Sequence, residues 1–284
     1  MQKGDIKWQW EITSRTSYRI SDVKALWSYR HFLASLVRRE FLLNYQQTIL
    51  GPFWIIFPPL VTLLTYILVF NKMVGISTGS IPPVLFYFSG IVLWNFFSDC
   101  WGGTSTTFKD NADLFSKVYF PRIIIPVSVV CTHFLRFLLQ FVFLLCMLAF
   151  YVFFKDFKIV LNLWLLMLPA AVGCVGLIAL GMGLLFSVLT AKYRDISNLV
   201  SLGVRLLMFV TPVIYPLTSI PQKWRFLVEI NPLTSFFEIF RKGLFGEGTI
   251  NLVMLLYSVC FTIVVSFGAL MIFNKQGDKL IDVV

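Results

Sequence analysis

Two arginines, Arg136 and Arg205, lie inside long apolar runs of the sequence. An unpaired cation in the hydrocarbon region of a membrane is costly, so such a residue usually faces a polar pathway. Arg205 follows Arg194 by about ten residues, which places it roughly 15 Å deep at 1.5 Å per residue. It is therefore a candidate to line a polar pathway and to bind an anionic group such as a phosphate. Arg136 lies in a longer run, where its side chain could equally extend to the interface.

Aromatic residues crowd the apolar runs at residues 51–70 and 82–101. Most of them fit an interfacial belt or bulk that faces lipid, because Trp and Tyr favour the membrane surface. Some ring faces could instead stack on the C–H faces of sugars, which would let a sugar polymer slide past without a fixed register. The candidates for this channel lining are Tyr66, Tyr87, Trp94, Phe97 and Tyr215.

The sequence holds few groups for catalysis or metal binding. No GxxxxGK[ST] phosphate loop, HExxH zinc motif or GxSxG nucleophile motif occurs, and His31 and His133 are far apart. The five cysteines show no CxxC or Cys/His spacing, so they predict neither a zinc site nor a disulfide framework. We therefore expect no catalytic residue, no metal and no cofactor in this chain.

The composition predicts an all-α polytopic membrane protein. Hydrophobic residues make up 58% of the chain and charged residues 13%, with a mean hydropathy of +0.81. Soluble domains use about 25% charged residues, so the solvent for most of this chain must be lipid. A helix crosses the hydrocarbon core with about 20 apolar residues. Six segments meet this condition: residues 51–70, 82–101, 123–154, 159–189, 198–217 and 251–273.

The distribution of Lys and Arg orients these segments. Basic residues concentrate before residue 50, in the second and fourth connections and in the tail. Cytoplasmic segments carry the excess of basic residues, so both termini are predicted to be cytoplasmic. The N-terminal segment also lacks the apolar core of a cleavable signal peptide. We divide the chain into a cytosolic N-terminal segment (1–50), a six-span domain (51–273) and a cytosolic tail (274–284).

The N-terminal segment contains a candidate surface helix. From residue 21 to 47, apolar residues recur at helical spacing, with Arg30, Arg38, Arg39 and Glu40 between them. This pattern predicts an amphipathic helix that lies at the cytoplasmic membrane interface. The alternative is a juxtamembrane run whose basic residues only set the topology.

Residues 218–249, between the fifth and sixth segments, contain two apolar stretches that are too short to cross a membrane. Asn231 and Pro232 separate them, and a proline interrupts helical hydrogen bonding, so we predict two short helices. Backbone can turn at membrane depth only where protein or a wet cavity surrounds it. We interpret the pair as an external re-entrant helical hairpin. The candidates for an external gate are Trp224, Phe237, Glu238 and Arg241.

Small residues form a stripe in the fourth segment, where Ala179, Gly183 and Ser187 recur every four residues. Such a stripe lets helix backbones approach closely in lipid. We predict close packing against another helix of the same chain.

Four short motifs, in this order, carry a resemblance to a known family. They are TILGPFW at 48–54, KYRDI at 192–196, TPVIY at 211–215 and NPL at 231–233. Together with the N-terminal amphipathic helix and the six-span layout, they resemble the ABC-2 type permeases. Within this family, the sequence is most similar to the transmembrane subunit that exports O-antigen, teichoic acid and capsular polysaccharides.

The resemblance implies a homodimeric permease that works with two copies of a separate cytosolic ABC ATPase, which binds ATP and Mg. In such transporters the N-terminal helix and the first cytosolic loop contact the ATPase, which here means residues 25–47 and a coupling loop within 102–122. The alternative for the loop is an ordinary polar connection. The candidate coupling residues are Arg30, Arg38, Arg39, Phe108, Lys109, Asp113, Leu114, Phe115 and Lys117.

The resemblance also implies an undecaprenyl-diphosphate-linked polysaccharide as substrate, in the bacterial cytoplasmic (inner) membrane, with no nucleic acid as partner. The sugar chain would pass between the two protomers. Because guanidinium groups bind phosphate oxygens through paired hydrogen bonds, Arg38, Arg39 and Arg205 become candidates for the diphosphate.

Other functions remain open at this point. Related exporters carry teichoic acid, capsule, lipid or drugs. A membrane-embedded sugar or acyl transferase would act without an ATPase. A channel or secondary transporter would be expected to show internal repeats and broken, ion-coordinating spans. No clear repeat occurs in this sequence.

Overall fold

The computed structural model describes residues 27–111, 114, 120–158, 162–193 and 195–280. Helices and their connections make up this part of the chain, and no strand occurs in it. Five helical segments are long and apolar enough to cross a membrane. They are Gly51–Met73 (η1 Gly51–Ile55, α3 Phe57–Tyr66 and η2 Ile67–Met73), α4 Pro83–Ser105, α7 Ile124–Lys155, Leu163–Lys192 (η3 Leu163–Met167 and α8 Leu168–Lys192) and α12 Leu252–Leu280.

The fifth predicted segment forms a shorter helix than expected. α9 runs over Ile196–Val210, 15 residues, and ends well before the predicted boundary at residue 217. Pro212 explains the early end, because the residue before a proline avoids the helical conformation. Thr211 accordingly adopts an extended conformation, with φ −98° and ψ 140°. A 15-residue helix is about 22 Å long, less than the roughly 30 Å of a hydrocarbon core.

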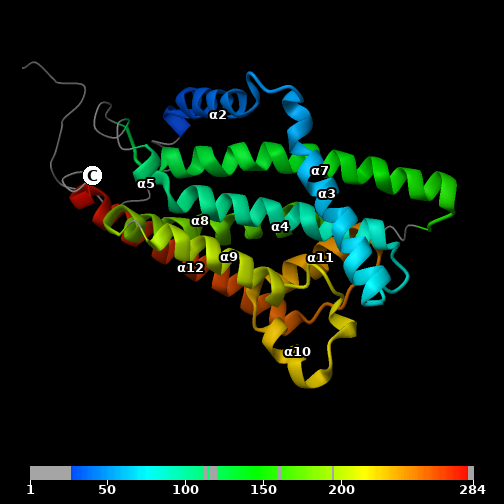
Figure 1. The fold of residues 1–284 in the computed structure, drawn as a ribbon. Coiled ribbons are helices and arrows are strands. Elements are labelled where there is room, and N and C mark those ends of the chain that lie inside the picture. The colour runs from blue at the N-terminus through cyan, green and yellow to red at the C-terminus, as the bar shows by residue number, and fades with distance from the viewer. Residues whose placement is uncertain (1–26, 112–113, 115–119, 159–161, 194, 281–284) are drawn as a thin grey trace, which may run out of the picture.

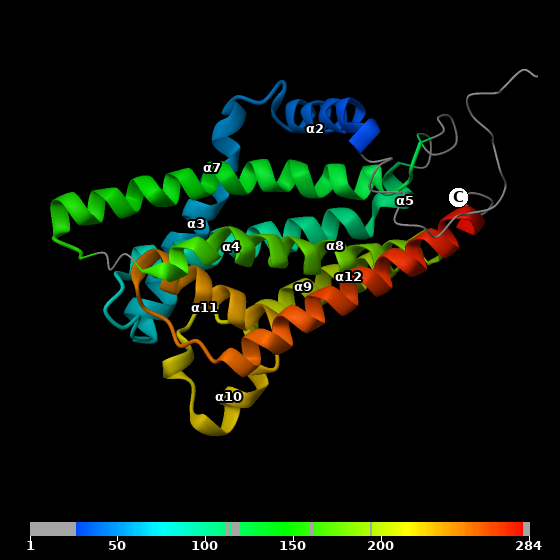
Figure 2. The same cartoon turned by 180° about the vertical axis from the view of Figure 1, so that it is seen from behind.

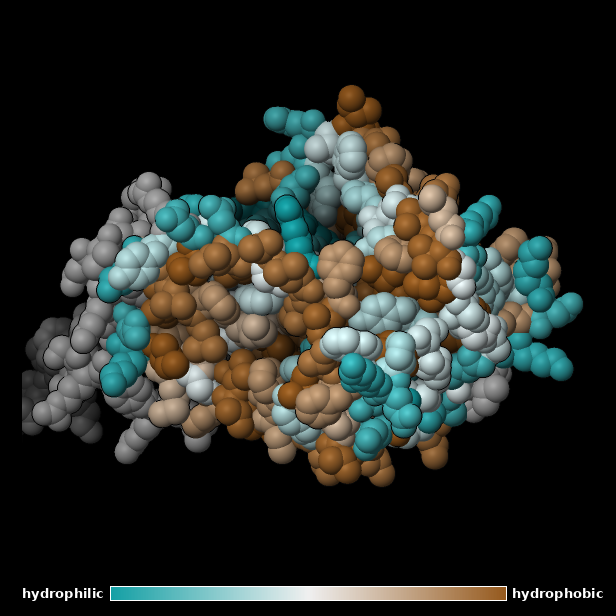
Figure 3. All heavy atoms as spheres, turned by 60° about the horizontal axis from the view of Figure 1, so that its bottom comes forward, coloured by the Kyte–Doolittle hydropathy of each residue, from teal (hydrophilic) through white to brown (hydrophobic). Residues whose placement is uncertain are grey.

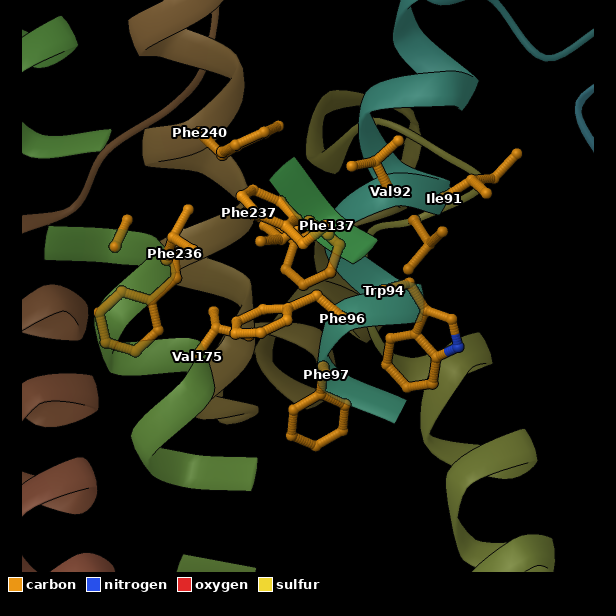
Figure 4. Close-up of a cluster of buried hydrophobic side chains, with 14 of the residues drawn as sticks. Ile91, Val92, Trp94, Phe96, Phe97, Phe137, Val175, Phe236, Phe237 and Phe240 are labelled. Atoms are coloured by element: carbon orange, nitrogen blue, oxygen red, sulfur yellow. The ribbon is translucent and has the colours of Figure 1, made fainter. Parts of the chain in front are cut away.

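α4 is the central helix of the bundle (Figures 1 and 2). It packs against α7 and α8, with α3 and α9 beside it, and most of its residues are buried. Aromatic rings fill the space between α4, α7 and α11 (Pro232–Phe245), where the Phe96 and Phe137 ring centres are 5.1 Å apart (Figure 4). The core therefore forms around α4.

Small residues of α8 allow the close contact with α4, as predicted. A Cβ at Gly183 would collide with Thr104, and a Cβ at Gly176 would lie 3.1 Å from the Phe96 ring. Ala179 and Ser187 are fully buried. The stripe of small residues is therefore confirmed as an intramolecular packing surface.

α2 (Arg30–Tyr45) packs lengthwise on the first half of α7. At one end the rings of Phe32 and Phe120 are 5.3 Å apart. At the other end, the Tyr45 ring lies beneath the guanidinium of Arg136. Of the helix predicted for residues 21–47, the structure confirms residues 30–45, and residues 21–26 lie outside the described part of the chain. The short α5 (Thr107–Asp110) follows α4.

The predicted break at Asn231 and Pro232 is confirmed, because it separates α10 (Gln222–Glu229) from α11. The Asn231 side chain accepts a hydrogen bond from the Leu233 backbone N–H and so caps α11. Its amide donates to the Thr211 hydroxyl at 2.8 Å, which ties the break to the end of α9. The final helix, α12, continues to Leu280, past the predicted boundary at residue 273.

Candidate functional site

Arg241 and Glu238, both predicted for an external gate, lie inside the protein, with exposed fractions of 2% and 5%. The Nη2 of Arg241 donates to the Val213 carbonyl at 3.0 Å, and its guanidinium carbon lies 3.9 Å from the centre of the Phe86 ring. Glu238 lies 3.7 Å from Nη1 of Arg241 and accepts a hydrogen bond from the Thr249 N–H. We call Arg241, Glu238 and Val213 the outer tie.

The outer tie joins three elements that are distant in sequence. Arg241 comes from α11, Phe86 from α4, and Val213 from the irregular turn after α9. Gly90 lets this turn approach α4, because a Cβ at Gly90 would lie only 2.7 Å from the Val213 carbonyl oxygen. Irregular backbone at membrane depth requires such protein partners for its carbonyl groups. The position of Arg241 therefore indicates a structural tie within the protomer.

The other predicted gate residues separate into two environments. Phe237 is buried in the core, whereas Trp224 on α10 is 56% exposed. Near α10, a cavity of about 110 Å³ lies between α10, α11 and the start of α12, lined in part by Arg225, Glu229 and Glu238. A cavity of this size and polarity has room for several water molecules.

Three of the five predicted channel-lining aromatics are core residues instead. Tyr87, Trp94 and Phe97 are buried within the protomer, and Figure 4 shows Trp94 and Phe97 among the packed side chains. They point inward because α4 is surrounded by α3, α7, α8 and α9. Tyr66 and Tyr215 are half-buried.

The residues of α4 that do reach the surface in its second half are polar or glycine. Apart from Gly103, we call them the polar stripe, and they are Asn95, Ser98, Asp99, Gly102 and the following Thr106. Asn95, Ser98, Gly102 and Thr106 follow one another at three or four residues, and Asp99 lies four residues after Asn95, which places all five on one helix face. Polar residues on the accessible face of a membrane helix mark a hydrophilic pathway, because lipid offers them no partner. Figure 3 shows an apolar surface interrupted by a hollow in which hydrophilic atoms are visible.

A charged cluster borders the polar stripe. The carboxylate of Asp99, whose side chain is 48% exposed, lies 3.9 Å from Nδ1 of His133 on α7. One turn farther along α7, the Arg136 guanidinium carbon lies 5.6 Å from the Tyr45 ring centre. Nδ1 of His133 and Nε of Arg136 are buried without a hydrogen-bond partner. In the part of the chain that the structure describes, no carboxylate lies within 4 Å of Arg136.

Tyr45 reaches this cluster from outside the long helices, at the end of α2. Burial raises the pKa of its hydroxyl above the usual value, and the neighbouring Arg136 partly opposes this shift. The hydroxyl therefore stays protonated at neutral pH and can donate a hydrogen bond.

Arg205 is exposed on α9. Gly203 faces the Trp101 ring, because a Cβ at Gly203 would lie 3.7 Å from it. α4 and α9 run in opposite directions (Figure 1).

The predicted coupling residues lie at the opposite end of the bundle from α10. Arg30, Arg38 and Arg39 are exposed on α2, and Lys109 is exposed on α5. Phe108 is instead buried, with its ring stacked on Phe273 at 5.1 Å, and Leu114 packs beside the apolar side of α2. Asp113, Phe115 and Lys117 lie outside the described residues.

A family model described as "ABC-2 type transporter" matches residues 31–245. The chain belongs to this family. The match runs from α2 to α11, so the polar stripe, Arg136, Arg205 and the outer tie all lie within it. Membership of the ABC-2 family identifies a membrane transport subunit and confirms the resemblance found in the sequence motifs.

Several curated relatives of this chain are transport proteins. The "O-antigen export system permease protein RfbA" of Myxococcus xanthus is 27% identical over 90% of this chain and 96% of its own length. A Klebsiella pneumoniae protein of the same description is 29% identical over 88% and 94%. The "Polysialic acid transport protein KpsM" of Escherichia coli is 25% identical over 87% and 94%.

Sequence reasoning missed the polar stripe, although a signal was present. Asn95, Ser98 and Asp99 interrupt the apolar run 82–101 near its end. The aromatic rings dominate the character of this run. The helical spacing of its polar residues nevertheless predicts that they share one face.

Proposed function

We propose that this chain is the permease subunit of an ATP-driven ABC transporter that exports a lipid-linked polysaccharide across the bacterial cytoplasmic membrane. One observation carries the proposal: the chain matches polysaccharide-export permeases over nearly the full length of both proteins. The greater identity to the O-antigen permeases than to the polysialic acid transport protein favours an O-antigen-like substrate.

The proposed topology has six crossings with both termini in the cytoplasm. Five crossings are the long apolar helices, and α9 with its buried turn is the sixth. Exposed apolar residues along α9, such as Leu199, Leu206 and Phe209, support a membrane position. α10 and α11 form the re-entrant hairpin on the outer side, since neither is long enough to span.

In the proposed arrangement α2 lies at the cytoplasmic interface. α7 has 32 residues and is about 48 Å long, which exceeds a hydrocarbon core by about 18 Å. α2 packs along the first half of α7, where this excess would leave the membrane. The exposed arginines of α2 would then face the cytosol and an ATPase.

The energy source in this proposal is a separate ATPase, two copies of which bind ATP and Mg beneath a homodimer of this chain. The absence of a phosphate loop from the sequence supports a separate subunit. The described coupling residues that remain accessible are Arg30, Arg38 and Arg39 on α2 and Lys109 on α5. Phe108 would transmit movement from within the bundle, because its ring contacts α12.

The polysaccharide would pass along the polar stripe of α4, between this chain and a second copy of it. Asn95, Ser98 and Asp99 can hydrogen-bond to sugar hydroxyls or to water in the pathway. Tyr66 and Tyr215 remain candidates to contact the glycan. Nucleotide-driven closure of the ATPases would shift the dimer between closed and open states of this path.

Deletion of the gene tests the proposal. We expect lipid-linked glycan to accumulate inside the cell and surface glycan to disappear. Expression of the wild-type chain should restore export, provided that the partner ATPase has an intact phosphate loop. Normal surface glycan in the deletion strain would contradict the proposed function.

A further inference from the structure

We propose that Arg136 is a positioning residue that links the cytosolic helix α2 to Asp99 in the polar stripe of α4. This inference rests on the proposed export function and adds to it a way in which the pathway is regulated. In this role Arg136 acts through Asp99 and does not itself contact the glycan or the ATPase.

Three polar side chains connect α7 to three other segments of the chain. His133 faces α4, with its Nδ1 at 3.9 Å from the Asp99 carboxylate. The guanidinium carbon of Arg136 lies 5.6 Å from the centre of the Tyr45 ring of α2. Gln140 donates to a backbone carbonyl of η1 at 3.0 Å. We call His133, Arg136 and Gln140 the polar ladder, because spacings of three and four residues place them on one face of α7.

The polar ladder lies on a helix that packs against both α2 and α4 (Figures 1 and 2). Gly103 lets α4 approach the ladder closely, because a Cβ there would lie 3.1 Å from Nε2 of His133. Polar side chains of an apolar helix gather where helices meet, since lipid offers them no partner. The ladder therefore joins α2, which carries the exposed coupling arginines, to α4, which carries the polar stripe.

The contacts around Asp99 are incomplete in this structure. Nδ1 of His133 and Nε of Arg136 are buried without a hydrogen-bond partner, while the Asp99 carboxylate lies 3.9 Å from Nδ1. The charge of Arg136 also acts electrostatically on Asp99. An N–H···O hydrogen bond spans about 2.9 Å, so a displacement of about 1 Å would complete the contact with His133. Because unpaired buried groups cost free energy, the cluster favours a second arrangement in which the carboxylate pairs with α7.

α2 supplies the movement that selects between the two arrangements. Tyr45 lies at the end of α2, and its ring covers one face of the Arg136 guanidinium. A displacement of α2 by the ATPase shifts Tyr45, and Arg136 then moves relative to Asp99. In one arrangement the half-exposed carboxylate can bond to water or to a sugar hydroxyl, and in the other it is withdrawn toward α7. Elements with two discrete arrangements can couple distant sites in this way.

Glycan export and ATP hydrolysis, measured on the same variants, test the inference. In cells, Arg136→Gln should lower surface glycan about tenfold at matched expression, and Tyr45→Leu about threefold. The purified permease–ATPase complexes of both variants in nanodiscs should still hydrolyse ATP at the wild-type rate. Lys155→Gln, at the exposed far end of α7, is the matched loss of one charge and should export normally.

Two results of these measurements would overturn the inference. A loss of export together with ATP hydrolysis in Arg136→Gln would show that the arginine only holds the fold. Arg136→Lys should recover part of the export, because it keeps the charge beside the Tyr45 ring. If Arg136→Lys exports as little as Arg136→Gln, the charge is not what matters and the inference fails.

A double variant tests whether Arg136 acts through Asp99. Asp99→Asn removes the charge that Arg136 positions, and it should lower export by about threefold on its own. Addition of Arg136→Gln should then cause no further loss, so the double variant should export more than Arg136→Gln alone. A double variant that exports no more than Arg136→Gln would show that the two residues act independently, which would contradict the inference.

Export by the wild-type chain separates this inference from the proposed function. If wild type exports glycan and Arg136→Gln exports it at the same rate, the positioning role is wrong and the export function stands. If the wild-type chain exports no glycan, the proposed function itself fails. A loss of export in Arg136→Gln that Asp99→Asn partly reverses, with ATP hydrolysis unchanged, supports both.

Discussion

Arg241 and Arg136 occupy contrasting places in the bundle. Arg241 is fully enclosed and has a carbonyl at 3.0 Å, a carboxylate at 3.7 Å and a ring at 3.9 Å. Arg136 is half-buried and has one ring at 5.6 Å. Both are arginines in apolar surroundings, yet of the two only Arg241 has a carboxylate within 4 Å among the described residues. The difference assigns Arg241 to the interior of the bundle and Arg136 to the junction between α7 and α2.

The same contrast divides α4 along its length. Near the outer tie, Gly90 is enclosed by the turn after α9, whereas Gly102 in the polar stripe has no neighbouring atom within 4 Å of an added Cβ. One end of the helix supports the hairpin, and the other faces an open space. The following changes test this division, in order of expected effect.

Arg241→Met should have the largest effect on stability. It leaves Glu238 buried without its cation and the Val213 carbonyl without a donor, which costs about 3–5 kcal/mol. The free energy of unfolding in detergent measures the loss. The control is Arg225→Met, which removes the Arg225–Glu229 pair at the surface of α10 and should cost about 1 kcal/mol or less. Equal losses would contradict the structural role of the outer tie.

Gly90→Ala should destabilise the protein by about 1–3 kcal/mol, because its Cβ would press on the Val213 carbonyl. Gly102→Ala on the same helix should be neutral or stabilising by up to about 1 kcal/mol, since alanine favours helix and meets no atom there. Unfolding measurements on both variants compare the two ends of α4 directly. The contrast fails if Gly102→Ala destabilises as much as Gly90→Ala.

Ser98→Leu should lower glycan export about tenfold while it changes the unfolding free energy by less than about 0.5 kcal/mol. The reason is that Ser98 lies in the polar stripe and a leucine removes its hydroxyl from the pathway. Export is measured as surface glycan at matched expression. Val142→Leu, on an exposed face of α7, is the control and should export normally. Normal export by Ser98→Leu would place the pathway elsewhere.

Tyr45→Leu should have the smallest effect, about 0.5–1 kcal/mol, through loss of the ring beneath Arg136. Tyr45→Phe keeps the ring and should unfold like wild type. The comparison of these two variants by denaturation separates the ring from the hydroxyl. If Tyr45→Phe loses as much unfolding free energy as Tyr45→Leu, the hydroxyl, and not the ring, holds Arg136 in place.

Long apolar runs made the main helices predictable. The first four predicted segments and the last one correspond to the five long apolar helical segments of the structure. They could be predicted because lipid permits only helices, whose backbone groups are paired internally. Asn231 and Pro232 likewise marked the break before α11 through local backbone chemistry. The end of α9 was missed, although Pro212 carried the signal for it.

The direction in which each side chain points could not be predicted from the apolar runs. Trp94 and Asn95 are neighbours in one apolar run, but Trp94 is buried in the core and Asn95 reaches the surface. Hydropathy treats the aromatic rings of a span alike, whereas the crossing of α7, α8 and α9 over α4 decides which face is covered. This explains why Tyr87, Trp94 and Phe97 were wrongly expected in the channel.

The amino-acid sequence by itself determined that the chain is a helical membrane protein, since its composition and its long apolar runs depend on no contact between distant residues. Only the tertiary structure decided which groups surround each buried arginine. Arg241 meets Val213 and Phe86, and Arg136 meets Tyr45, across long stretches of chain. The energy of a charge at membrane depth depends on its nearest partners, and folding alone brings those partners together.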